Sequence, residues 1–124
     1  MPSEVFHNLH IKLIISIINL INIQRIDMKL LSIVFSFKNE EKNIEPLVQR
    51  ISSVMEKVQG WEYELIFVND DSTDNSEKVL LELQENFPIK IINMSRNFGI
   101  DPCVLAGFRN TNGDAIIYLH TDQQ

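Results

Sequence analysis

The residue types best suited to chemistry follow a short apolar segment near the middle of the chain. Residues 65–68 are Leu, Ile, Phe and Val, and they run directly into Asn69-Asp70-Asp71-Ser72-Thr73-Asp74. The apolar run predicts a buried strand, and ligands of open α/β sheets bind just beyond the carboxyl ends of the strands. A carboxylate there can accept a hydrogen bond from a nucleobase or a sugar hydroxyl, or help to hold a cation. Asp, Ser and Thr also form turns and cap helices, so the segment alone fits a ligand site and a capping turn equally well.

Three further polar clusters follow predicted strands in the same way. They occupy residues 36–41, 95–99 and 120–124. Right-handed crossovers bring the carboxyl ends of parallel strands to one edge of a sheet. We therefore expect the four clusters to converge on a single rim, and this convergence carries more weight than any one cluster.

The segments between these clusters alternate between strand and helix patterns. Near-continuous apolar runs predict strands over residues 30–37, 63–68, 89–94 and 115–119. A helix that stops at Gly60 is indicated by apolar residues at helical spacing: Ile44, Leu47, Val48, Ile51, Val54, Met55 and Val58. The order of elements predicts an α/β fold, with a Rossmann-like, mostly parallel sheet covered by helices on both faces.

Two more helices are predicted with their starting residues. Asp74 and Glu77 resemble a capping box, before a helix that Pro88 ends. Asp101 and Pro102 resemble an N-cap followed by proline at the first helical position. The apolar residues expected to face the core are Val79, Leu80, Leu83 and Phe87 in the first of these helices, and Val104, Leu105 and Phe108 in the second.

Composition and missing motifs narrow the classes of function. The 124 residues carry a net charge of −6, which argues against a nucleic-acid partner but not against a nucleotide held with a metal ion. The single cysteine, Cys103, excludes an internal disulfide and is expected to serve packing. The chain has neither the glycine fingerprint of dinucleotide-binding proteins nor a P-loop, and no Cys/His spacing suggests structural zinc. A diphosphate therefore needs another cradle, which carboxylates holding a hard cation can supply.

Residues 1–27 differ from the rest of the chain. Residues 11–23 are almost entirely Ile, Leu and Asn, with apolar stretches too short to span a bilayer and no clear signal-peptide pattern. An ordinary globular pattern begins at Met28. We expect 1–27 to be an extension outside the domain, with Met28 as the natural start, and residues 28–124 to form the domain.

Residues 28–124 resemble the N-terminal, donor-binding half of a family 2 glycosyltransferase with the GT-A fold. They are most similar to polyprenyl-phosphate sugar transferases of the dolichol-phosphate mannose synthase type. Four motifs carry the resemblance, in the right order and each at a predicted strand end: Ser36-Phe37-Lys38-Asn39-Glu40-Glu41 for Pro-x-Tyr-Asn-Glu-Glu, Val68-Asn69-Asp70-Asp71-Ser72-Thr73-Asp74 for Val-Asp-Asp-Gly-Ser-Thr-Asp, Ser95-Arg96-Asn97-Phe98-Gly99 unchanged, and His120-Thr121-Asp122-Gln123-Gln124 for Asp-x-Asp-Leu-Gln.

The resemblance implies roles for the matching residues. Asp70 corresponds to the carboxylate that contacts the nucleotide base, with Asp71 beside it. Ser36, Lys38 and Glu40 would line the nucleoside pocket. Arg96 fits a phosphate contact and a solvated loop arginine equally well. Asp74 is expected to serve only as a helix cap.

The resemblance also implies a metal site for Mg²⁺ or Mn²⁺. Asp122 corresponds to a metal ligand that bridges the ion to the donor diphosphate, and Gln124 to a position that assists the metal in some relatives. His120 replaces the first Asp of the motif; imidazole suits Mn²⁺ better than Mg²⁺, and an exposed histidine that binds no metal is the favoured alternative.

The implied activity is metal-assisted, inverting transfer of a sugar from a UDP- or GDP-linked donor to an acceptor, such as a polyprenyl phosphate or a cell-envelope glycan precursor. The sequence stops at Gln124, before the acceptor half, so the catalytic base is expected beyond Gln124 and no turnover is expected from this chain alone. A cytoplasmic location is implied, at the inner face of the membrane for a full-length parent. The alternative is a non-catalytic module that binds a nucleotide or a protein and has a degenerate metal motif.

Overall fold

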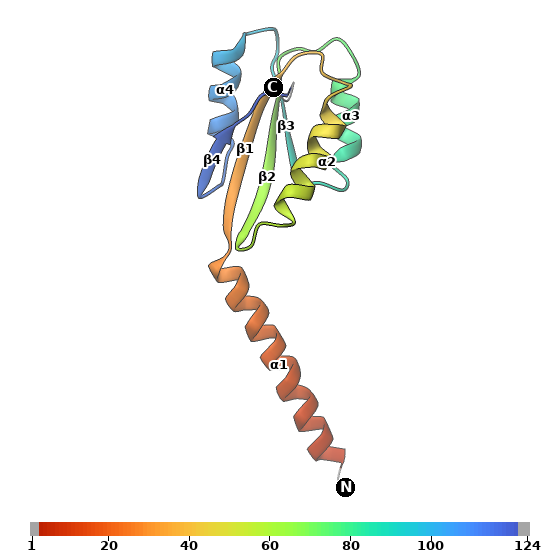
Figure 1. The fold of residues 1–124 in the computed structure, drawn as a ribbon, viewed down its shortest axis with the longest axis vertical. Helices are drawn as coiled ribbons and strands as arrows, with labels where there is room; N and C mark the ends of the chain where they lie inside the picture. Colours follow the sequence, from red (N-terminus) through yellow and green to blue (C-terminus); the bar gives the residue numbers. More distant parts are fainter. Residues whose placement is uncertain (1–2, 122–124) are drawn as a thin grey trace.

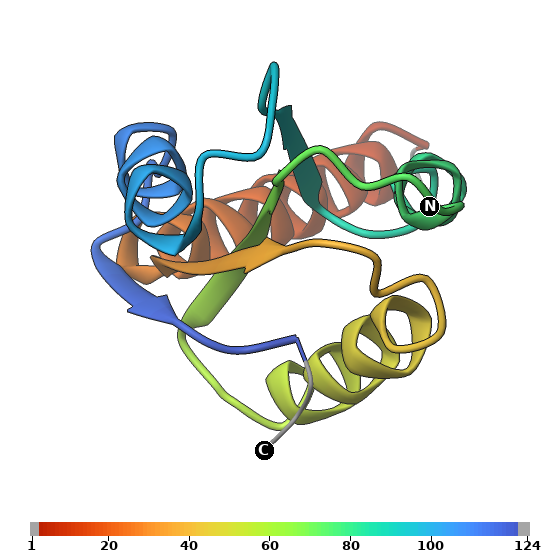
Figure 2. The ribbon, with the colours of Figure 1, turned by 90° about the horizontal axis from the view of Figure 1, so that it is seen from above.

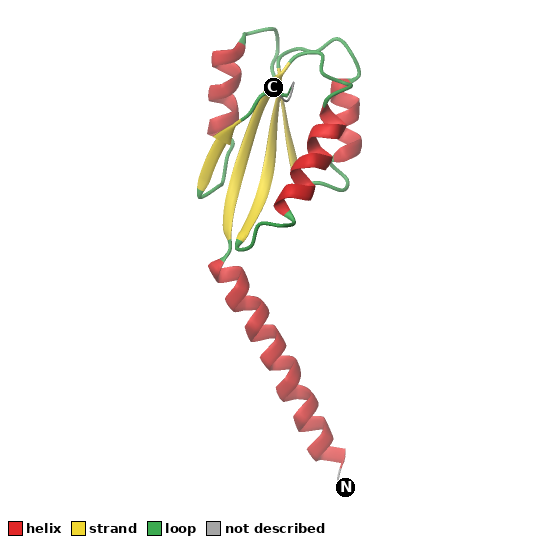
Figure 3. Ribbon diagram, viewed as in Figure 1, coloured by secondary structure: helices red, strands yellow, loops and turns green. Residues whose placement is uncertain are grey.

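The computed structural model describes residues 3–121, including the side chains of residues 9–21 and 28–121. Helices and strands alternate along the domain, and a long helix precedes it (Figures 1 and 3). The elements are α1 (Ser3–Asp27), β1 (Lys29–Phe37), α2 (Ile44–Met55), β2 (Trp61–Asn69), α3 (Ser76–Leu83), β3 (Ile89–Asn93), α4 (Ile100–Arg109) and β4 (Ala115–Tyr118).

The four strands of the described chain form one parallel sheet in the order β3-β2-β1-β4. β1 is central and pairs with β2 along its whole length, so that Phe37 lies opposite Asn69 at the carboxyl end. β4 pairs with the other side of β1, with Tyr118 opposite Val34. The predicted α/β class and parallel sheet are confirmed, and the carboxyl ends of all four strands point to the same edge.

Helices cover both faces of the sheet, as expected (Figure 2). Alternate strand residues point to opposite faces, and one set packs with α2 and α3 around Phe35 and Phe67, whose rings stack at 4.7 Å. The other set, including Val34 and Val68, packs against α4. α4 comes very close to the sheet because Gly107 has no side chain to hold it away from Val34.

Some predicted core positions are wrong. In α4, Leu105 and Phe108 are exposed, and the buried residues are Cys103 and Gly107. The close approach of α4 selects its smallest residues for the interface, and its larger apolar residues face solvent. Val54 and Val58, expected in the buried face of the helix before Gly60, are also exposed, and Val58 lies beyond the end of α2.

α1 projects away from the domain at the end of the sheet where β1 begins (Figure 1). Its exposed large apolar residues are Leu9, Ile11, Leu13, Ile14, Ile15, Ile17, Ile18, Leu20 and Ile21. Over the described residues, no helix combines enough length and hydropathy to cross a membrane. That residues 1–27 lie outside the natural protein stays a prediction.

Candidate functional site

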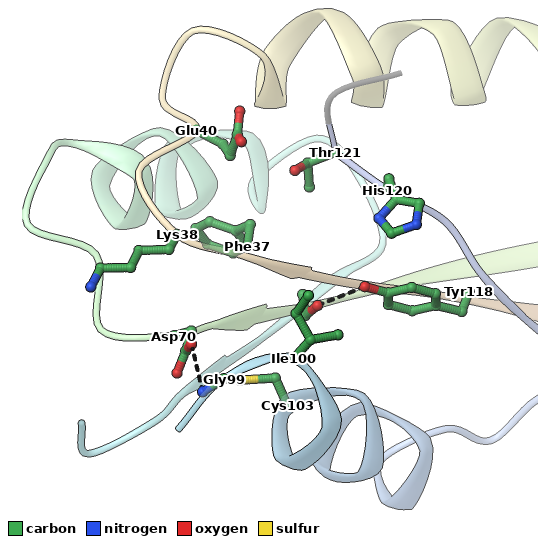
Figure 4. A pocket seen from close by; sticks show the side chains of 11 residues that line it. Phe37, Lys38, Glu40, Asp70, Gly99, Ile100, Cys103, Tyr118, His120 and Thr121 are labelled. Carbon is green, nitrogen blue, oxygen red and sulfur yellow. Dashed lines mark hydrogen bonds between the residues drawn. The ribbon is translucent and has the colours of Figure 1, made fainter. Parts of the chain in front are cut away.

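The strand ends and the loops that follow them enclose a cavity of about 210 Å³ at the carboxyl edge of the sheet (Figure 4). Its walls come from the ends of β1, β2 and β4 and from the start of α4. The predicted convergence of polar clusters is therefore present in the described part of the chain. The lining residues are Ser36, Phe37, Lys38, Glu40, Asp70, Gly99, Ile100, Cys103, Tyr118, His120 and Thr121.

The loops after β1 and β2 are tied together by Asn39. Its backbone N–H donates to Ser72 Oγ at 2.9 Å, and its side-chain oxygen accepts from the backbone N–H groups of Thr73 at 2.8 Å and Asp74 at 3.2 Å. Asn39 adopts a φ of 55°, a left-handed conformation that Asn tolerates better than most residues. The backbone and side chain of Asn39 thus connect the two loops on the β1–β2 side of the rim.

Asp74 joins the same two loops and precedes α3. Its Oδ1 accepts from the backbone N–H and the hydroxyl of Ser76, and its Oδ2 accepts from the N–H of Glu41. Burial acts to raise the pKa of Asp74, but these hydrogen bonds outweigh it and hold the pKa below its usual value. The expected capping box is not formed, because α3 begins at Ser76 and the Glu77 carboxylate accepts from the Asn93 amide instead.

Asp70 holds the loop that leads into α4. Its carboxylate is nearly buried, and it accepts from the backbone N–H of Phe98 at 2.7 Å and of Gly99 at 3.1 Å. These donors precede α4, which begins at Ile100. The prediction that Asp101 is the N-cap is therefore wrong, and the carboxylate at this helix start comes from Asp70, the residue directly after β2, rather than from the local sequence.

Gly99 allows this arrangement because its φ is 89°, a conformation that residues with a side chain rarely adopt. Cys103 lies one turn into α4 and is fully buried, as its expected packing role requires. Burial, together with the adjacent Asp70 carboxylate, raises the pKa of the Cys103 thiol to about 12. The thiol is therefore protonated at neutral pH and can act as a hydrogen-bond donor.

The wall of the cavity away from Asp70 is built from aromatic and hydroxyl groups. Ser36 Oγ and the Tyr118 hydroxyl share a hydrogen bond of 2.8 Å, and the Tyr118 ring meets the His120 ring edge-on at 5.4 Å (Figure 4). Ser36 was predicted as a site residue, but Tyr118 was not. Only the pairing of β4 with β1 brings Tyr118 to Ser36, and the sequence does not state which strands are neighbours.

The remaining predicted binding residues divide into two groups. Lys38 and Glu40 line the cavity. The Glu40 carboxylate accepts a hydrogen bond from the Asn43 amide at 2.6 Å. Figure 4 shows the Lys38 ammonium extended away from His120. Asp71 and Arg96 are exposed and do not line it. The Arg96 guanidinium lies 4.5 Å from the centre of the Phe98 ring.

Most of the predicted metal site lies outside the residues that the structure describes. Asp122 and Gln124 lie outside the described residues. His120 is exposed and lines the cavity, and the described residues contain no cluster of three His, Cys, Asp or Glu side chains that could hold a metal ion. The imidazole of His120 is a suitable ligand type for Mn²⁺, and its part in a metal site stays a prediction.

A buried carboxylate at mid-sheet fixes the turn that leads into β4. Glu64 Oε1 accepts from Ser32 Oγ and from the backbone N–H of Asn112, each at 2.7 Å, while Lys90 Nζ lies 3.3 Å from Oε2. Burial acts to raise the pKa of Glu64, but the hydrogen bonds from Asn112 and Ser32 and the charge of Lys90 together lower it. Glu64 thereby anchors the start of β4, the strand that carries Tyr118 to the cavity.

Comparison with known proteins gives consistent matches to this domain. The family model described as glycosyl transferase family 2 matches residues 32–124. The dolichol-phosphate mannosyltransferase of Pyrococcus furiosus is 32% identical over 93 residues, which cover 75% of this chain and 26% of the relative. The chain thus spans about a quarter of the length of that curated relative.

Solved structures share the fold at low sequence identity. The structure of S. aureus TarS 1-349 superposes with a TM-score of 0.66 at 20% identity, over 77% of this chain and 28% of TarS 1-349. The mannosyltransferase PcManGT from Pyrobaculum calidifontis, in complex with GDP-Man and Mn²⁺, superposes with a TM-score of 0.61 at 15% identity, over 77% of this chain and 28% of PcManGT. These likenesses confirm the predicted GT-A type of Rossmann-like fold.

Proposed function

Because the chain belongs to glycosyl transferase family 2, we propose that residues 28–124 bind the sugar donor, a nucleoside diphosphate sugar, at the cavity described above. The family is one of glycosyltransferases, so the parent activity is transfer of a sugar. The relative from P. furiosus supports a hexose as the transferred group.

The observation that carries the proposal is the position of the cavity and its donors and acceptors. It lies at the carboxyl edge of a parallel sheet, where α/β proteins bind nucleotides, and its walls present the Asp70 and Glu40 carboxylates and the Ser36 hydroxyl. Such groups can accept from a base and from ribose hydroxyls. Lys38 also lines the cavity and adds a positive charge, which favours an anionic ligand.

The proposed cofactor is Mg²⁺ or Mn²⁺, held by Asp122 with Gln124 and, for Mn²⁺, His120. When bound, such an ion neutralises the charge that develops on the departing nucleoside diphosphate. The solved structure of PcManGT contains Mn²⁺ with GDP-Man, which supports a divalent ion in this family. The contribution of the described residues is to bind the nucleoside and to place His120 at the edge of the cavity next to the donor.

For the parent protein we propose inverting transfer to a polyprenyl phosphate or a cell-envelope glycan precursor. The name of the P. furiosus relative, a dolichol-phosphate mannosyltransferase, supports a lipid phosphate as acceptor. Such an acceptor favours action at the cytoplasmic face of a membrane. No base that could activate the acceptor is assigned within this chain, and we expect the chain to bind donor without turning it over.

One observation favours a second candidate, a nucleotide- or protein-binding module without catalysis. His120 stands where the family motif has an acidic residue, which removes a negative charge from the metal site. In that case nucleotide would bind equally well with and without a divalent ion.

Calorimetric titration of the 124-residue chain with UDP, GDP, UDP-glucose and GDP-mannose, each with and without Mn²⁺, tests the proposal. We expect at least one nucleotide to bind, and to bind more tightly with Mn²⁺. Lys38→Met should weaken this binding by about two- to fivefold, the range typical of an exposed charge pair, whereas Lys42→Met, which removes the same charge outside the cavity lining, should not. Absence of binding to all four ligands contradicts the proposal, and binding that ignores Mn²⁺ favours the second candidate.

A further inference from the structure

The helix α1 is mostly apolar, yet its side chains lie in solvent. Every side chain of residues 9–21 is exposed, and none of them belongs to either core cluster of the domain. The large apolar side chains of this segment are between 40% and 60% exposed. A helix that is apolar around most of its surface is normally buried. The domain does not supply that burial in this structure, so α1 offers a surface for a partner.

The few polar side chains of α1 lie together on one side of the helix. Lys12, Ser16 and Asn19 are spaced by four and three residues, which places them in one stripe along the helix. At 3.6 residues per turn, the apolar side chains of residues 9–21 cover an arc of about 240° around the axis, interrupted by His10. A face that packs on one neighbour is only about 100° wide. More than one neighbouring surface is therefore needed to cover α1.

The middle of this apolar arc follows the spacing of a helical bundle. The spacing of three and four residues defines positions a and d of a heptad repeat, and a seam of four isoleucines occupies them: Ile11, Ile14, Ile18 and Ile21. The flanking e and g positions hold Ile15 and Ile17, which widen the seam, while the polar stripe falls at the outward b and f positions. Isoleucine at both a and d favours three or four helices over two. The width of the arc and the residue type in the seam thus agree on the number of neighbours.

From these two features we infer that α1 joins copies of this chain into a trimer or tetramer, through a bundle of α1 helices. The partner is another copy because identical helices bring matching isoleucine seams, and symmetric self-association is the commonest form of assembly in soluble proteins. Figure 1 shows α1 leaving the domain at the end of the sheet where β1 begins, away from the carboxyl edge that holds the cavity. Bundling therefore leaves the cavity open, and the inference is independent of the proposed function.

A lipid surface fits α1 less well than another copy does. Helices that lie on membranes carry a strongly charged face that is rich in Lys and Arg. Over residues 9–21 the polar stripe contains a single Lys or Arg, which is Lys12. The charge that would hold the helix on an anionic membrane is thus nearly absent from this segment.

Sedimentation equilibrium of the intact 124-residue chain, without detergent and over a concentration series, measures the assembly. We expect a mass three or four times that of the monomer, with dissociation on dilution. A mass that stays at the monomer or the dimer overturns the inference, and the monomer leaves α1 without a role, as expected if Met28 is the natural start. Co-sedimentation with vesicles of phosphatidylcholine and phosphatidylglycerol covers the other partner: a chain that binds vesicles but does not self-associate also overturns it.

Two lysine substitutions test whether the seam holds the copies together. Ile18→Lys places a charge at position a, where it would lose its water, and should weaken the association at least about tenfold. Leu20→Lys is the control: it adds the same charge at an equally exposed position of the same helix, but about 160° around the axis from Ile18. This variant should keep the mass of the unaltered chain. Equal dissociation of the two variants contradicts the seam, and should one fail to fold, the mass of the unaltered chain decides.

Discussion

Replacing Asp70 by Asn tests whether this carboxylate is the structural centre of the rim. The substitution keeps shape and size but turns one acceptor oxygen into an NH₂ group. Of the two backbone donors now bound, the N–H of Phe98 can keep its acceptor, while that of Gly99 would face another donor about 3.1 Å away. The same change removes the negative charge from the remaining hydrogen bond.

The expected size follows from these contacts. A hydrogen bond to a charged group contributes about 1.5–3 kcal/mol, and one such bond is lost while the other is weakened. Asp70 is nearly buried, so water replaces the lost contact poorly. We expect Asp70→Asn to lower the free energy of unfolding by about 2 kcal/mol, which for a urea m-value of about 2 kcal/mol per M is a midpoint shift of about 1 M.

Urea unfolding followed by circular dichroism measures this shift, with Asp71→Asn as the control. Asp71 is adjacent and exposed, and its left-handed φ of 61° is one that Asn also tolerates, so this variant loses the same charge at a cost below about 0.5 kcal/mol. If the two variants unfold at the same urea concentration, the Asp70 carboxylate does not hold the loop before α4.

Three further predictions concern the scaffold of the site. Glu64→Gln should lower the free energy of unfolding by about 1–3 kcal/mol at neutral pH. Because the pKa of Glu64 is lowered in the folded state, the wild-type protein should lose this extra stability as the pH falls below about 4.5. A stability difference that persists unchanged in acid would contradict the role of the Glu64 charge. Gly107→Ala should cost about 1–3 kcal/mol, since the new methyl group meets Val34, and an unaltered melting temperature would refute the close approach of α4. Asp71→Ala should be less stable than Asp71→Gly by about 1 kcal/mol in urea unfolding, because Ala disfavours a positive φ; equal stabilities would count against that backbone conformation.

Strands were easier to predict from this sequence than helix faces. The buried runs around Phe35 and Phe67 are apolar because both faces of these strands are covered, and such runs are visible without knowledge of the fold. In α4 the prediction chose Leu105 and Phe108 because they are large and apolar. The observed interface depends on Gly107, which has no side chain and lets α4 approach the sheet closely. The spacing of apolar residues cannot identify such a position, because it counts only large apolar side chains.

The location of the site was predictable, but its inner structure was not. Parallel topology alone brings the polar strand ends to one edge, so Ser36, Lys38, Glu40, Asp70 and His120 were identified as residues that the structure now places around one cavity. The contribution of Tyr118 depends on β4 lying beside β1, which is a property of strand order. The start of α4 was misplaced because local sequence patterns show only nearby carboxylates. The carboxylate that accepts from the N–H groups before α4 belongs to Asp70, which is distant in sequence.

The acidic cluster after β2 therefore resolves the choice between a capping turn and a ligand site in an unexpected way. Both oxygens of Asp74 accept from Ser76 and Glu41, and each oxygen of Asp70 accepts one backbone N–H from the loop before α4. Both carboxylates organise backbone, but only Asp70 also faces the cavity. A carboxylate held by several internal donors is fixed in orientation before a ligand arrives, so little ordering remains to be done on binding. The two contacts from the 98–99 backbone thus make the remaining lone pairs of Asp70 directional, so the fold itself orients the acceptor that a ligand in this cavity would meet.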